Sequence, residues 1–182
     1  MQAYDLAATS VGNYALFGGG HKDTSSTSTV IDTVYSINTS LTASKITSLS
    51  EAKDDLTAAS VGNYALFAGG VPLGSTDDGF SSIVDVYNTS LTRITPISLS
   101  GTRVRMAAAS LGDYAIFGGG ATGTPTGSSI GYNPVNIVDV FDTSLTRTTI
   151  TGLSEAKYDH AATTLGNYAI FGGDSTVDVY TM

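Results

Sequence analysis

Four copies of one nine-residue segment run through the chain and constrain its fold more than any other feature. Each copy starts with Gly, then Asn or Asp, then Tyr, continues with Ala, Leu or Ile, and Phe, and ends in a glycine-rich triplet. The copies cover residues 12–20, 62–70, 112–120 and 166–174, so their phenylalanines are spaced by 50, 50 and 54 residues. This period is typical of repeat architectures, in which each copy forms one structural unit.

The second repeat predicts the structure of one unit most clearly. Short runs of β-branched, aromatic and small residues are separated by turn formers, which favours strands over helices. We name the strands A, B, C and D and expect them at residues 57–61, 64–67, 83–87 and 93–97. Gly62 allows the positive φ of a two-residue type II′ turn between A and B. Pro96 favours an edge position for D, because proline cannot donate to a ladder.

The other repeats follow the same pattern, with units expected at about residues 1–50, 51–100, 101–154 and 155–182. The fourth unit has strands A, B and C only. From the phenylalanine of B to the aromatic residue assigned to C (Tyr35, Tyr87, Phe141 and Tyr180), the chain takes 18, 20, 24 and 9 residues. Length variation is therefore concentrated in the B–C loop, which is where repeat proteins place recognition.

These features resemble the kelch repeat, a β-propeller family. The resemblance rests on the Gly-Gly doublets at 19–20, 69–70, 119–120 and 172–173 and on the aromatic residue in strand C. It implies an all-β, kelch-like propeller of three complete four-stranded antiparallel blades plus a three-strand fourth blade, forming one domain or half-propeller over residues 1–182. The chain departs from the kelch pattern in having no Trp, and the strand-D slot holds Ile94 or Thr148 instead.

Ring closure is open at this point, because kelch propellers usually have six or seven blades. The chain could be a fragment of a longer propeller, pair with itself into a ring of about eight blades, or close alone as a four-bladed ring. We expect a homo-oligomer or a fragment of a longer propeller. An exposed blade face of Tyr and Phe would be an apolar patch that soluble monomers rarely tolerate.

Composition excludes several classes of function. The net charge of −8 would repel phosphate backbones, so no nucleic-acid partner is expected. No stretch approaches the roughly 20 apolar residues of a membrane span, and the N-terminus lacks the features of a signal peptide. The compartment stays unknown, although the Ser/Thr-rich, Lys-poor composition is compatible with an extracellular or surface-exposed location.

Few known catalytic or metal-binding patterns fit the sequence. Residues 18–23 are glycine-rich but lack the Gly-Lys-Ser/Thr ending and the helix of a phosphate-binding loop. His21 and His160 occupy different slots, and His160 aligns with Leu6, Leu56 and Met106, which predicts a core or channel-wall position. There is no cysteine, which excludes thiolate chemistry. We therefore expect no enzyme activity, no cofactor and no metal.

The remaining candidates are recognition residues on the face where B–C loops and D–A connections are expected to meet. The candidate ligand-binding residues are His21, Lys22, Asp23, Lys53, Asp54, Asp77, Asp78, Phe80, Arg103, Arg105, Tyr132, Asn133, Lys157 and Tyr158. Replacing Arg103 and Arg105 by Ala is expected to leave folding intact and to weaken an anionic or peptide ligand. The sequence thus predicts a non-catalytic scaffold that binds a protein or other macromolecule. The alternatives are a structural self-assembling surface or fibre protein and a carbohydrate-binding propeller.

Overall fold

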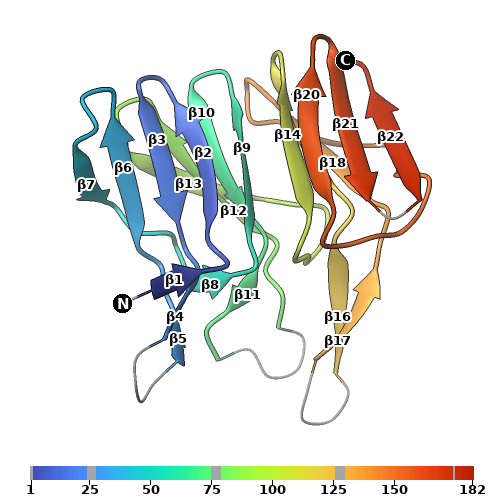
Figure 1. Ribbon diagram of the computed structural model, residues 1–182, viewed down its shortest axis with the longest axis horizontal. Helices are drawn as coiled ribbons and strands as arrows, with labels where there is room; N and C mark the ends of the chain where they lie inside the picture. The colour runs from blue at the N-terminus through green and yellow to red at the C-terminus, as the bar shows by residue number, and fades with distance from the viewer. Residues whose placement is uncertain (1, 24–27, 75–78, 126–129, 174) are drawn as a thin grey trace.

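The described residues of the chain form only β-structure (Figure 1). The computed structural model describes residues 2–23, 28–74, 79–125, 130–173 and 175–182. Three four-stranded antiparallel sheets and one three-stranded antiparallel sheet follow one another along the chain, together with three smaller sheets of short strands. None of the described residues forms a helix long and apolar enough to cross a membrane.

Strand order within each large sheet equals chain order, so every sheet is a simple meander of strands A, B, C and D. The first sheet contains β2 (Ala7–Val11), β3 (Tyr14–Gly18), β6 (Val34–Asn38) and β7 (Ala43–Ile46). The second contains β9 (Thr57–Val61), β10 (Tyr64–Ala68), β12 (Ile83–Asn88) and β13 (Arg93–Ser98). The third contains β14 (Ala107–Leu111), β15 (Tyr114–Gly118), β18 (Val138–Asp142) and β19 (Arg147–Ile150). The fourth contains β20 (Ala161–Leu165), β21 (Tyr168–Gly173) and β22 (Thr176–Tyr180).

Local chemistry accounts for the turns. Val61 pairs with Tyr64, which leaves the two-residue A–B turn that was predicted, and Gly62 has a φ of +52°. In the C–D turn, Asn88 Oδ1 accepts hydrogen bonds from the N–H groups of Ser90 (3.0 Å) and Thr92 (3.1 Å). The same side-chain bonds recur at Asn38 and Asp142. Pro96 lies in β13, the outermost strand of its sheet, as expected.

The register of the first sheet corrects one sequence assignment. Tyr35 pairs with Phe17, whereas the residue that pairs with the equivalent Phe67 is Asp85. The position of Tyr87 is occupied in the first sheet by Ile37. Taking Tyr35 as the equivalent of Tyr87 was therefore wrong by two residues. The C–D turn fixes the register. The asparagine that begins this turn is residue 38 in the first repeat and residue 88 in the second.

Short strands occur where the sequence analysis expected only loops and turns. They are β1 (Gln2–Tyr4), β4 (His21–Asp23), β5 (Ser28–Val30), β8 (Lys53–Asp54), β11 (Val71–Pro72), β16 (Ala121–Pro125) and β17 (Ile130–Pro134). Two of the pairings join a B–C loop to segments outside its own sheet, namely β1 with β4 and β8 with β11. Such pairings depend on tertiary neighbours, which local sequence patterns do not reveal.

The core lies between successive sheets. Strands A form the inner wall, where β2 lies beside β9, β9 beside β14 and β14 beside β20. Phe67 and Tyr87 of the second sheet pack against Leu16 and Val34 of the first. Phe117 and Phe141 pack in the same way on the second sheet, and Phe171 and Tyr180 on the third. Each buried aromatic side chain stabilises its interface by about 1.5–3 kcal/mol.

Candidate functional site at the loop end of the sheets

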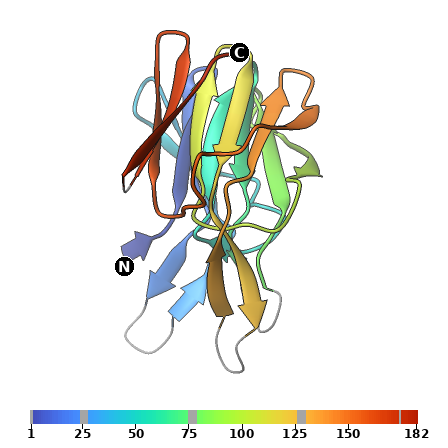
Figure 2. The same cartoon turned by 90° about the vertical axis from the view of Figure 1, so that its right-hand side faces the viewer.

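The B–C loops and the D–A connections, which link each sheet to the next, meet at one end of the molecule (Figure 2). The glycine doublets hold them together: Gly70 N–H donates to the Arg103 carbonyl oxygen at 3.0 Å, and Gly20 and Gly120 bind the Lys53 and Lys157 carbonyls in the same way. A Cβ on Gly69 would lie 2.2 Å from the Arg103 carbonyl oxygen. The doublet is thus required by the close approach of the next connection.

Three predicted ligand-binding cations prove to be structural, which corrects the sequence analysis. Lys53, Arg103 and Lys157 are buried. Lys53 Nζ lies 3.2 Å from Asp85 Oδ2, and Lys157 Nζ lies 3.3 Å from Asp178 Oδ2. Arg103 pairs with Asp139 and also donates to the carbonyl oxygens of Gly119 (2.8 Å) and Ile137 (3.0 Å). A charged side chain is buried only when it is paired, and these partners lie in strand C of the following sheet.

The carboxylate of each ion pair also accepts a hydrogen bond from the backbone N–H of the serine that lies three residues before the cation. Ser50 N–H donates to Asp85 at 2.9 Å, Ser100 N–H to Asp139 at 3.0 Å and Ser154 N–H to Asp178 at 2.8 Å. We refer to each set of serine, cation and aspartate as a clamp. The sequence analysis missed the aspartates, although Leu-Ser-x-x-Lys/Arg before every such strand signals them. The clamps fix each D–A connection between two sheets.

A ring of charged residues surrounds the point where strands A begin. Asp5, Asp55, Arg105 and Asp159 occupy equivalent positions, and all four have a φ between 51° and 55°. Arg105 lies between two of these carboxylates, with Nε 2.8 Å from Asp55 Oδ2 and one terminal nitrogen 3.3 Å from Asp159 Oδ2. Arg105 is therefore a partly exposed predicted site residue whose charge is already balanced by neighbours.

An aromatic cluster lies beside Arg105. Tyr132 stacks on Phe80 with ring centroids 5.6 Å apart and on Tyr158 with centroids 5.9 Å apart. The Arg105 guanidinium carbon lies 4.5 Å from the centroid of the Tyr132 ring. Phe80 is buried, whereas Tyr132 and Tyr158 are exposed. Residues from the second, third and fourth repeats thus form one surface, and all four belong to the predicted set.

The remaining predicted residues lie around the first repeat, on β17 of the third repeat or outside the described part of the chain. Tyr4 stacks on His21, and His21 Nδ1 lies 2.9 Å from Asp54 Oδ2. The Tyr4 hydroxyl donates to Asp23 at 2.7 Å. Lys22 is half-buried on β4, and Asn133 is exposed on β17. Asp77 and Asp78 lie outside the described residues.

Acidic groups dominate the charge of this end. The carboxylates outside the clamps include Asp5, Asp23, Asp54, Asp55 and Asp159. Among the described residues of this end, the cations outside the clamps are Arg105 and Lys22. Burial, together with the charges of Asp55 and Asp54, raises the pKa of Asp5 above its ordinary value of 3.8. A positively charged ligand would relieve this repulsion.

His160 packs against the fourth sheet. It is half-buried and tilted against Phe171, with ring centroids 6.3 Å apart. Neither ring nitrogen has a hydrogen-bond partner among the described residues. Burial, assisted by the charge of Lys157, lowers its pKa below 6.5. In that environment His160 is a neutral packing residue.

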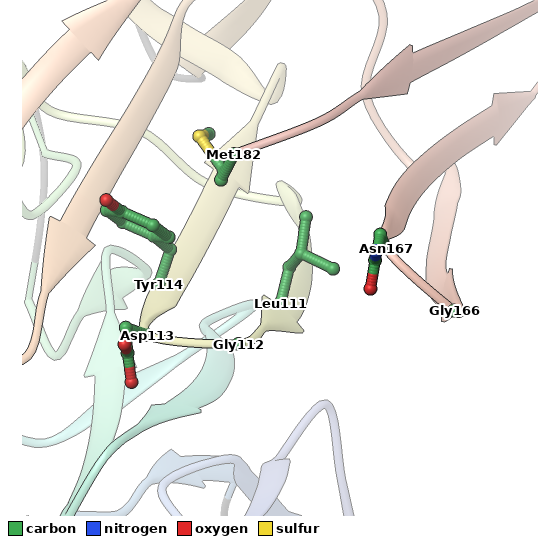
Figure 3. Close-up of a pocket in the computed structure, with 7 residues that line it drawn as sticks. All are labelled: Leu111, Gly112, Asp113, Tyr114, Gly166, Asn167 and Met182. Atoms are coloured by element: carbon green, nitrogen blue, oxygen red, sulfur yellow. The ribbon is translucent and has the colours of Figure 1, made fainter.

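A separate cavity of about 360 Å³ opens at the opposite end (Figure 3). It lies between the A–B turns of the third and fourth sheets and is lined by Leu111, Gly112, Asp113, Tyr114, Gly166, Asn167 and Met182. Asp113 is its single carboxylate, so the cavity lacks a paired acid and base. No group of three or more His, Cys, Asp or Glu side chains suited to a metal occurs in the part of the chain that the structure describes.

Comparison with known proteins bears on the fold. No protein-family model matches the sequence, and no curated protein matches it. Among solved structures, the chain is similar to YjhT, a kelch-repeat β-propeller protein, with a TM-score of 0.73 and 13% sequence identity. The fold is that of a kelch propeller. The similarity covers 93% of this chain and 58% of the YjhT chain, so this chain spans somewhat more than half of that protein's length.

The four sheets are therefore propeller blades, with strands A innermost. The clamps lie between consecutive blades, and the aromatic cluster with the ring of charged residues lies on the propeller face that carries the B–C loops and D–A connections. We call this face the loop face.

Proposed function

We propose that the chain is a non-catalytic binding module that recognises a macromolecular ligand with its loop face. The observation that supports this most directly is the aromatic cluster, in which Tyr132 and Tyr158 stay exposed beside a cation-bearing ring of charged residues. Tyrosines that present both a ring and a hydroxyl to solvent are enriched at binding interfaces. Phe80 and Tyr132 come from the B–C loops of the second and third repeats, which differ in length.

The charge of the loop face favours a protein segment that carries Lys or Arg. Asp55 and Asp159 flank Arg105, and the three clamp cations are neutralised by Asp85, Asp139 and Asp178. An anionic ligand, which the sequence analysis considered, would find no unpaired cluster of cations among these described residues. A basic segment would instead be steered by the carboxylates and could stack its apolar parts on Tyr158.

A peptide array tests this proposal. Basic, acidic and neutral peptides of matched length are probed with the purified chain at low and high salt. We expect retention on the basic peptides, weaker at high salt, and a loss of about tenfold or more on Tyr158→Ala, as for a typical interface anchor. Tyr158→Phe keeps the ring and is expected to retain binding. Equal retention of acidic peptides, or binding unchanged by Tyr158→Ala, would contradict the proposal.

A carbohydrate ligand is the second candidate for the same face. Its support is the combination of exposed tyrosine rings with carboxylates in the ring of charged residues, since sugar rings stack on aromatic faces while their hydroxyls donate to carboxylates. A glycan array carried out with the same variants distinguishes the two. Self-association, the other part of the sequence-based expectation, concerns different surfaces, namely the outer faces of the first and fourth blades.

A further inference from the structure

The first blade exposes a face that every other blade buries. Phe17 is 37% exposed, whereas the equivalent Phe67, Phe117 and Phe171 are 0% exposed because each packs on the preceding blade. Tyr35, on the same face, is 50% exposed. We call this the receiving face of the first blade. It presents an aromatic surface with nothing from the described residues of this chain packed against it.

The fourth blade exposes the face that, in the other blades, is covered by the following blade. Leu165, Val177 and Val179 are 68%, 66% and 55% exposed. Their equivalents in the third blade, Leu111, Val138 and Val140, are 7%, 0% and 4% exposed because the fourth blade covers them. We call this the donating face of the fourth blade. Its apolar side chains match those that carry the three internal interfaces.

A glycine marks the place where the next aromatic ring would lie. A Cβ on Gly18 would be 3.1 Å from Phe67 Cε1, and a Cβ on Gly118 would be 2.8 Å from Phe171 Cε1. At Gly172, the equivalent in the fourth blade, such a Cβ would meet only Val177 Cγ2, at 3.9 Å, among the described residues. A hollow of about 200 Å³ lies there, lined by Ala161, Ala162, Thr163, Ile170 and Gly172. The fourth blade thus has a seat for a phenylalanine ring, and the seat is empty.

We propose that a second copy of this chain covers both faces, forming a two-fold symmetric ring of eight blades in which Phe17 of each copy lies on Gly172 of the other. The two faces are the two halves of an interface that the chain already builds three times, which makes a second copy a sufficient partner. One two-fold axis satisfies both faces of both copies at once. Eight blades lie within the range that propellers adopt.

The residue that takes the place of the clamp aspartate in the first blade agrees with a second copy as the occupant. In the second, third and fourth blades, the C-strand residue facing the preceding blade is Asp85, Asp139 or Asp178, and each needs a cation from a D–A connection. In the first blade that residue is Tyr35. The position of the cation is held by Ala3 in the first repeat, so both members of the clamp ion pair are missing there. An uncharged residue is the one that can be buried there without an unpaired charge.

The assembly proposal goes beyond loop-face binding and is tested separately from it. Light scattering on the purified chain at micromolar concentration is expected to give twice the mass of one chain. Gly172→Val places a branched side chain in the proposed seat while leaving the isolated chain unstrained, since its Cβ meets only Val177 Cγ2, at an ordinary contact distance of 3.9 Å, and its φ is not positive. We expect it to raise the dimer dissociation constant by about tenfold or more, because overpacking is destabilising.

Gly101→Val is the matched control, because a Cβ at Gly101 has nothing within 4 Å and its φ is not positive, yet it lies in a D–A connection. It is expected to keep the dimer mass. Circular dichroism checks that both variants are folded. A monomeric wild-type chain, which would indicate further blades in a longer polypeptide as the occupant, overturns the proposal. So does an open series of larger assemblies, or a dimer that Gly172→Val leaves unchanged. Peptide binding by a monomer would leave the loop-face proposal standing.

Discussion

The ion pair between Arg103 and Asp139 offers a quantitative test of how the blades are joined. The Arg103 side chain is fully buried, and its guanidinium donates to Asp139 and to the carbonyl oxygens of Gly119 and Ile137. Replacing Arg103 by Met fills a similar volume and removes all three hydrogen bonds. Because Asp139 stays buried, its charge then loses its strongest partner.

The size of the effect follows from these contacts. Breaking a buried ion pair by removing one partner costs about 3–5 kcal/mol. Asp139 would keep the Ser100 N–H at 3.0 Å, the Thr149 hydroxyl at 2.8 Å and Arg147 at 3.2 Å, which places the expected cost at the lower end. About 3 kcal/mol, divided by a urea m-value of about 2 kcal/mol/M, corresponds to a midpoint lowered by about 1.5 M.

Urea unfolding followed by far-ultraviolet circular dichroism measures this shift, since the chain has no Trp to report by fluorescence. Arg147→Met is the matched control, because Arg147 binds the same carboxylate but its side chain is 35% exposed. An exposed partner of this kind contributes about 0–1 kcal/mol. Replacing Arg103 and Asp139 together by Met and Leu is expected to cost less than the sum of the two single changes.

The prediction made from the sequence gives a different expected result for the Arg103 variant. The sequence analysis expected Arg103 at a ligand surface, where its replacement would leave folding intact. A loss below about 1 kcal/mol for Arg103→Met, with an unchanged m-value, would refute the clamp and return Arg103 to the list of surface residues.

Three further outcomes are expected from the same unfolding assay. Gly69→Ala should cost more than about 2 kcal/mol, because its φ of +67° and the Arg103 carbonyl 2.2 Å from the new Cβ both oppose it, whereas Gly101→Ala should stay within about 0.5 kcal/mol. His160→Leu should stabilise the chain by about 1 kcal/mol at pH 7, since the ring nitrogens have no partner among the described residues; a loss of stability would contradict this. Burial alone would raise the pKa of Asp139, but the Ser100 hydrogen bonds and Arg103 bring it below 3.8. Its stabilising contribution is therefore complete above about pH 4 and lost as the pH falls through the lowered pKa, so equal urea midpoints at pH 6 and pH 3 would argue against it.

Features governed by neighbours in sequence could be predicted well. The A–B turn depends on Gly62 and the two residues that flank the turn, and strand A of the second repeat occupies residues 57–61 as expected. The C–D turn depends on Asn88 and the N–H groups within four residues of it. Fourfold repetition of these local signals made the blade pattern predictable without knowledge of the tertiary structure.

The clamp cations could not be placed from composition or local pattern. A Lys or Arg in a polar segment is normally solvated, so Lys53 and Arg103 were interpreted as surface residues. Their burial depends on aspartates 32 and 36 residues later in the sequence. The signal existed only as a correlation between repeats: Leu-Ser-x-x-Lys/Arg precedes each C strand that contains Asp.

The first blade agrees with this correlation, because the clamp aspartate and the clamp cation are both absent there. Tyr35 replaces the clamp aspartate there, and Ala3 stands where the later repeats have Lys53, Arg103 and Lys157. Both members of the ion pair are missing together, so neither leaves an unpaired charge in an interface. The apolar residues of that face are nevertheless retained, with Phe17 in the place of Phe67. Loss of the two charges and retention of the aromatic ring let the first blade pack against a neighbour without burying an unpaired charge.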